Sequence, residues 1–255
     1  MKHGDFSGLA SDYARFRAGY APQVASAILS YVGSDPACID AVDVGAGTGI
    51  WTRMLAARGL RSVVAVEPND DMRAQGIQTS LATNIVWRKG SAEATGLPNA
   101  SADLVSMASA LHWTDFDRAR DEFHRILRPG GTFAALWNPR FIEANPLLSE
   151  IEAEITRLKP DLQRVSSGRS GITERLTDKL CADPRFAEVL YLEGRHSVQQ
   201  TPERYIGAWR SVNDLQVQLG TELFRKFLDF VEARIAGLTA IETTYLTRAW
   251  VARRA

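Results

Sequence analysis

A chain of 255 residues, 45% of them hydrophobic, has room for one sizeable α/β domain with an accessory element. It is too short for two full domains joined by a linker. Thirty basic residues balance thirty acidic ones, so the formal charge is zero and no overall field attracts nucleic acid or an anionic membrane. We therefore expect neither as a partner.

Cysteine and histidine usage indicates no metal or redox centre. Cys38 and Cys181 lie far apart, and neither belongs to a metal-type or redox pair. The four histidines show no ligand spacing, so we expect no metal site. No apolar run approaches membrane-spanning length, and the first residues lack a signal-peptide core. We expect a cytoplasmic protein whose oligomeric state, a homo-oligomer included, is left open.

The first segment is rich in aromatic residues and arginines. Between residues 6 and 20, Tyr13, Phe16 and Tyr20 are interleaved with Arg15 and Arg17. Such a pattern suits either a helix stapled to the domain or a lid over a ligand. A helix should follow from Pro22 and end at Gly33, since proline opens helices and glycine ends them.

A glycine-rich turn follows the first buried strand. Residues 41–44 form a short apolar run that includes Asp43, and Gly45, Gly47 and Gly49 come directly after it, before a helical pattern. Glycine lets the backbone turn tightly and lets a ligand approach without a Cβ in the way. A dinucleotide-binding fingerprint would place its third glycine at position 50, where this chain has Ile50. The turn predicts a small-molecule cradle of another kind.

The second apolar run, residues 63–66, ends in Glu67. A carboxylate at the tip of this strand can accept hydrogen bonds from both ribose hydroxyls of a nucleoside. With Asp43 and the three glycines in place, the chain resembles a class I S-adenosylmethionine-dependent methyltransferase of the broad small-molecule and quinone-type subgroup. The resemblance implies an α/β fold, a Rossmann-like seven-stranded sheet of order 3-2-1-4-5-7-6 with an antiparallel last strand, plus helical lid and cap elements.

The resemblance also implies S-adenosyl-L-methionine as cofactor and assigns residues to it. Arg17 would pair with the methionyl carboxylate, Met72 would pack on adenine, and the loop after residues 85–88 would read the adenine edge. Met72 can equally be a core residue, and Glu93 a solvated loop acid. The cofactor candidates are Arg17, Asp43, Gly45, Ala46, Gly47, Gly49, Glu67, Met72, Ala92 and Glu93.

The fourth strand, 102–107, leads into His112 and Trp113, at the sheet edge where ligands bind. Either they are packed structural residues or, as the resemblance suggests, His112 accepts a proton from the methyl acceptor. Tyr13 is the second catalytic candidate. The Asn/Asp-Pro-Pro-aromatic tetrad of nucleic-acid amino methyltransferases is absent at this point, which disfavours base methylation. Phe116, in the first turn of a helix over 115–127, is a candidate acceptor contact.

A Leu-x-Pro-Gly-Gly turn at 127–131 leads into the fifth strand, 132–137, and strengthens the resemblance. Arg140, after that strand, is either solvated or a contact for an anionic acceptor. Asn138-Pro139 is judged an accidental likeness to the tetrad. A polar stretch at 164–171 is predicted to be a mobile loop, with helices on either side.

The last third predicts strands at 186–192, 195–198 and 243–251, and helices from Thr201 and over 220–235. We divide the single domain into a lid (1–33), a cofactor-binding core (34–140), helices with the sixth strand (141–200), a helical acceptor cap (201–240) and the last strand (241–255). Trp209 and Arg210 either pack the cap or contact the acceptor. The acceptor candidates are Tyr20, Trp113, Phe116, Arg140, Trp209 and Arg210.

These features predict methyl transfer to nitrogen or oxygen of a small organic molecule, such as a specialised metabolite. One alternative is a carboxyl methyltransferase of the trans-aconitate type, in which Arg140 and Arg210 clamp the acid. Another is a cofactor-binding regulatory protein without catalysis. A nicotinamide oxidoreductase is disfavoured by Ile50.

Overall fold

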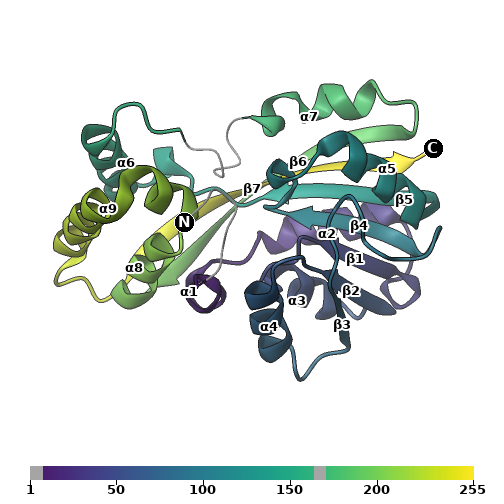
Figure 1. Cartoon of the computed structure of the whole chain (residues 1–255), viewed down its shortest axis with the longest axis horizontal. Coiled ribbons are helices and arrows are strands. Elements are labelled where there is room, and N and C mark those ends of the chain that lie inside the picture. Colours follow the sequence, from purple (N-terminus) through teal and green to yellow (C-terminus); the bar gives the residue numbers. More distant parts are fainter. Residues whose placement is uncertain (1–7, 164–170) are drawn as a thin grey trace.

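Seven strands form one sheet in the order β3-β2-β1-β4-β5-β7-β6, as predicted (Figure 1). The computed structural model describes residues 8–163 and 171–255. Strands β1 to β5 run parallel, and β7 lies antiparallel between β5 and β6. The strands are β1 Asp40–Val44, β2 Ser62–Val66, β3 Ile85–Arg88, β4 Ala102–Ala108, β5 Leu127–Trp137, β6 Phe186–Gln200 and β7 Ile241–Arg254.

Helices cover both faces of the sheet, which is why the central strands are apolar on both sides. On one face, α2 (Pro22–Val32) and α3 (Ile50–Ala56) pack Ile28, Trp51 and Leu55 against the sheet. On the other, α5 (Phe116–Ile126) and α7 (Ile172–Cys181) contribute apolar side chains to a second core. The predicted stop of α2 is confirmed, because Gly33 adopts a left-handed conformation with φ of 78°.

A third apolar core lies at one end of the molecule, on the left in Figure 1. It joins α6 (Pro146–Leu158), α8 (Pro202–Arg210) and α9 (Asn213–Ile235). Thr201 caps α8 as predicted, accepting a hydrogen bond from the Arg204 amide at 3.2 Å. The sequence predicted only the part of α9 from residue 220 onward. Gly220 interrupts the helix with φ of 67°, so the turns before it do not continue one helical pattern.

Strands β6 and β7 form a long ribbon that runs from the sheet to this helical end (Figure 1). Two separate strands were predicted where β6 is continuous. The predicted gap contains Gly194, which pairs with Thr247 inside the ribbon. A Cβ on Gly194 would lie 2.7 Å from a methyl carbon of Val24, so glycine there allows α2 to pack closely on the strand.

The N-terminal helix α1 (Ala10–Phe16) contacts both α8 and α4 (Asp70–Thr79). Phe16 packs against Gly207 of α8, where an added Cβ would lie 2.4 Å from the Phe16 ring. The short helices η1 Pro36–Cys38, η2 Leu111–Trp113 and η3 Ile142–Ala144 complete the described elements. Residues 1–7 of the expected lid, and all but Gly171 of the polar stretch expected to be mobile, lie outside the described residues.

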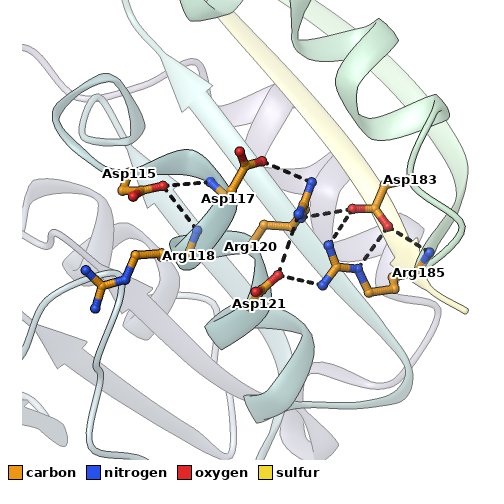
Figure 2. A network of polar contacts seen from close by, with 7 residues as sticks. All are labelled: Asp115, Asp117, Arg118, Arg120, Asp121, Asp183 and Arg185. Atoms are coloured by element: carbon orange, nitrogen blue, oxygen red, sulfur yellow. Dashed lines mark hydrogen bonds and ion pairs between the residues drawn. The ribbon is translucent and has the colours of Figure 1, made fainter.

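An ionic network fastens α5 to the chain just before β6 (Figure 2). Asp183, whose side chain is 5% exposed, binds the Arg120 Nε at 2.9 Å and the Arg185 Nη2 at 2.8 Å. Arg185 also reaches Asp121 on α5 at 2.5 Å. Asp115 caps the same helix by accepting from two amides of its first turn.

No helix within residues 8–163 and 171–255 combines the length and apolar character needed to cross a membrane. Across those same residues, no three histidine, cysteine, aspartate or glutamate side chains come together in a way that could hold a metal ion.

Candidate active site

A cavity of about 520 Å³ opens at the carboxyl ends of β1, β2, β4 and β5. This is the edge at which open parallel sheets bind ligands, and the volume is typical of small-molecule sites. Of the predicted site residues, the cavity brings together Tyr13, Arg17, Tyr20, Gly45, Ala46, Gly47, Glu67, Met72, Ala92, Glu93, His112, Trp113 and Arg140.

The floor of the cavity is the glycine turn after β1. Gly45 and Gly47 have φ of 66° and 57°, a region that side chains other than glycine rarely adopt. A Cβ on Gly45 would lie 2.7 Å from the Cβ of Ala110. At Gly47 the nearest atom to an added Cβ is 3.8 Å away, on Met72, so the turn is open toward the cavity at this point.

Glu67 stands at the end of β2, beside that open turn. Its two carboxylate oxygens accept hydrogen bonds from the backbone amides of Gly47, at 2.7 Å, and Asn69, at 2.8 Å. Burial raises the pKa of Glu67, and the two amide hydrogen bonds oppose that rise. Asn69 in turn caps α4 by accepting from the Met72 amide at 3.0 Å, which fixes the thioether at the cavity wall.

Two residues of the glycine motif lie behind the cavity and do not line it. Asp43 is fully buried and accepts a hydrogen bond from the Thr52 hydroxyl at 2.6 Å. Burial raises the pKa of Asp43 to about 7. Gly49 begins α3 with φ of 79°, and an added Cβ there would lie 2.9 Å from the Trp87 ring. Both residues hold the turn rather than face the ligand space.

The loop after β3 forms another wall. Ala92 is buried, and Glu93 accepts a hydrogen bond from the Asp115 amide at 3.0 Å. This bond ties the loop to the start of α5, so the wall has a fixed position relative to the helix that follows η2.

Residues around α1 close the cavity from the N-terminal side. The Arg17 guanidinium lies 4.9 Å from the Tyr13 ring centre and donates to the Ser211 hydroxyl at 2.9 Å, which links this segment to α8. The Tyr20 hydroxyl lies 2.9 Å from the Ser109 hydroxyl at the end of β4. Burial raises the pKa of Tyr20, so its hydroxyl stays protonated.

His112 and Trp113 lie in η2, directly after β4. The Trp137 indole donates a hydrogen bond to His112 Nδ1 at 3.1 Å, and the Trp113 ring centre lies 4.5 Å from the imidazole. Burial lowers the pKa of His112 to about 4, so the ring is neutral near pH 7. The two residues that were predicted together therefore share one wall.

Comparison with known proteins identifies the part of the chain that contains the glycine turn. Residues 42–135 match a family described as "Methyltransferase domain". These residues carry a methyltransferase domain, and the sheet order is that of the class I methyltransferase fold. An uncharacterised methyltransferase of Mycobacterium tuberculosis is 38% identical over 136 residues, which are 53% of this chain and 52% of that protein. This chain spans about half the length of the curated relatives it matches.

Two further comparisons extend the likeness. The ubiquinone/menaquinone biosynthesis C-methyltransferase of Rubrivivax gelatinosus is 38% identical over 96 residues, covering 37% of this chain and 38% of that one. A solved structure, a candidate type II methyltransferase from Anaeromyxobacter dehalogenans, has 24% identity, a TM-score of 0.64 and coverage of 93% and 98% of the two chains. The second likeness concerns the fold alone, and it extends beyond the matched methyltransferase domain to most of the chain.

Three of the predicted acceptor contacts do not line the cavity. Trp209 is fully buried in the third core, with its ring 5.3 Å from that of Phe227. Arg210 is paired with Glu232 on the surface at 2.9 Å. Phe116 packs instead against Arg120 and Lys179. Trp209 still supports the site, because the Arg140 guanidinium lies 3.9 Å from its ring centre while Arg140 lines the cavity.

Sequence reasoning missed several residues of this methyltransferase domain's cavity. Ser109 directly follows β4 and has φ of 55°, a strained conformation often found at functional sites. Asn138 directly follows β5, donates to the Gly19 carbonyl at 2.8 Å and accepts from the Thr247 hydroxyl at 2.7 Å. A signal for their position was present, because both residues lie within two positions of the end of a predicted parallel strand. Trp137, Glu152 and Asn213 also line the cavity.

Proposed function

We propose that this protein uses S-adenosyl-L-methionine to transfer a methyl group to nitrogen or oxygen of a small organic molecule. The observation that carries the proposal is the Glu67 carboxylate, held at 2.7 Å from the amide of the open Gly47 turn inside one 520 Å³ cavity. When bound, this cofactor supplies a methyl group already activated on a sulfonium.

The residues present fit such a cofactor. Glu67 would accept hydrogen bonds from the ribose hydroxyls, and the open turn at Gly47 would let the nucleoside approach the backbone. Met72 and Ala92 offer buried apolar surface for adenine. Arg17, which lines the cavity, would pair with the methionyl carboxylate.

The chain's own contribution to the chemistry is positioning and exclusion of water. Displacement at an activated methyl group needs its nucleophile close and collinear, and no enzyme nucleophile. Tyr20 is fixed by Ser109, and the Gly19 carbonyl accepts hydrogen bonds from Asn138 and His196 Nε2. The segment between α1 and α2 is therefore held against the cavity, where Tyr13 and Trp113 would contact the acceptor.

We further propose that residues 1–33 act as a lid and residues 201–240 as an acceptor cap. Ser211 and Asn213 support this, because Ser211 binds Arg17 and Asn213 lines the cavity. For a carboxylate acceptor, the expected clamp of Arg140 with Arg210 is not assembled, since Arg210 is paired with Glu232. Arg140 would therefore bind a carboxylate acceptor without help from Arg210.

The test is calorimetric binding of S-adenosylmethionine and S-adenosylhomocysteine to the wild type, to Glu67→Gln and to Asp70→Asn. Loss of the charge-assisted hydrogen bonds to ribose should weaken binding by roughly 10- to 100-fold in Glu67→Gln. Asp70→Asn changes an exposed acid three residues away that does not line the cavity, and it should bind as the wild type does. Absence of binding to the wild type would refute the proposal.

A further inference from the structure

The His112 ring is oriented by a single donor. Trp137, 1% exposed at the end of β5, places its indole Nε1 3.1 Å from His112 Nδ1. An indole N–H can only donate, so Nδ1 must be the unprotonated, accepting nitrogen. Trp137 is itself held from behind by the Trp250 ring at 5.6 Å, whose indole donates to Thr177 at 2.9 Å.

The second ring nitrogen of His112, Nε2, is the donor. With its pKa lowered to about 4, the ring is neutral near pH 7, so its one proton sits on Nε2. Nε2 is buried and makes no hydrogen bond to any part of the chain that the structure describes. His112 lines the cavity, so a group bound there would be the partner for this N–H.

We propose that His112 serves the acceptor as a hydrogen-bond donor through Nε2–H, and that the acceptor enters as an oxygen anion such as a carboxylate, an enolate or an acidic phenol. The inference rests on the proposed methyl transfer and narrows its substrate class. It differs from the general base expected from the sequence, because the only ring lone pair already accepts from Trp137.

The proton balance agrees with this assignment. An anionic acceptor oxygen forms a new C–O bond with the methyl group while the C–S bond breaks and its electron pair stays on sulfur. The positive and negative charges cancel, and no proton has to leave. An alcohol would release a proton, for which the His112 ring offers no vacant lone pair.

Charged groups on the acceptor side allow an anion. Arg140 lines the cavity, as does the acidic residue Glu152, while Arg17 is the proposed partner of the cofactor carboxylate. Asp214 is the charged group that acts on the His112 ring itself, favouring its protonation less strongly than burial opposes it. The N–H of Nε2 thus adds a neutral donor to the positive charge that Arg140 brings to the cavity.

The first experiment needs no acceptor. In protein labelled with ¹⁵N-histidine, long-range correlation spectra at pH 7, assigned by the spectrum of His112→Gln, should show His112 neutral and protonated on Nε2. Trp137→Phe removes the fixing donor and should raise the population protonated on Nδ1. A wild-type ring protonated on Nδ1, or charged, would overturn the inference while leaving cofactor binding untouched.

The second experiment measures transfer of a radiolabelled methyl group to a panel of carboxylic acids, acidic phenols, alcohols and amines. Products should arise from the acids and phenols, whereas comparable turnover of neutral alcohols or amines would contradict us. On the best acceptor, His112→Gln keeps a donor and removes the base, and His112→Leu removes both. We expect kcat of the leucine variant to fall at least about tenfold below that of the glutamine variant. Equal losses of kcat in the two variants would contradict the donor role and support a general-base role for His112.

Discussion

The charge state of Asp43 makes the methyltransferase core sensitive to pH. Its folded pKa is about 7, raised by burial from an ordinary value of 3.8. Between those values the folded state keeps a proton that the unfolded state has lost. The contribution of Asp43 to stability should therefore fall as pH rises from about 4 to 7, because the folded state binds more protons in that range, and it should level off above pH 7.

Asp43→Asn should remove this dependence. Relative to the wild type, the variant should gain about 2 to 4 kcal/mol in free energy of unfolding between pH 4.5 and pH 8. The measurement is urea unfolding at both pH values, with the exposed Asp71→Asn as control. A parallel pH profile for Asp43→Asn and wild type would mean that Asp43 is ionised in the folded protein.

At the scale of the element, α1 packs on α8 through the close contact between Phe16 and Gly207. Alanine normally stabilises a helix by about 0.5–1 kcal/mol relative to glycine. In Gly207→Ala the new Cβ would lie 2.4 Å from the Phe16 ring, so alanine should destabilise the protein at this position. We expect a loss of about 1–3 kcal/mol in unfolding free energy as α1 is displaced.

If α1 is a lid, Gly207→Ala should also weaken S-adenosylhomocysteine binding measured by calorimetry. The double variant Gly207→Ala/Phe16→Ala removes the clash and should be more stable than the sum of the single changes implies. Additive effects would show that α1 and α8 are not coupled through this contact.

At the scale of the whole molecule, the network in Figure 2 joins the cofactor half of the chain to the ribbon. Asp183→Asn should lower the free energy of unfolding at pH 7 by about 1–3 kcal/mol, because two arginines lose a buried partner. Asp117→Asn, in an exposed pair with Arg120, should cost less than about 0.5 kcal/mol.

The Asp183 effect should also depend on pH in a defined direction. The arginines hold the pKa of this carboxyl below its ordinary value, so its contribution is complete above about pH 4 and is lost as pH falls. Urea unfolding at pH 7 and pH 3 measures the difference. A deficit of Asp183→Asn that persisted unchanged at pH 3 would contradict an ionic origin.

The sheet order followed from its resemblance to a known family, and the boundaries of most elements followed from local signals that proline, glycine and capping residues give. The meeting of Glu67 with the glycine turn was also predictable, because both directly follow neighbouring parallel strands. The hydrogen bonds of Ser109 and Asn138 were not predictable, since their partners Tyr20 and Gly19 lie about ninety or more positions away in the chain. Helical spacing alone could not tell that Trp209 faces Phe227 rather than the cavity.

The ribbon also bears on how such a protein can diversify. Gln200 and Ile241 pair directly across β6 and β7, so the forty residues between them leave and rejoin the ribbon at adjacent positions. Another sequence could be spliced between these two points without shifting any strand of the sheet. Recombination at this junction would exchange the proposed acceptor cap as one unit and leave the part of the sheet that carries Glu67 in place.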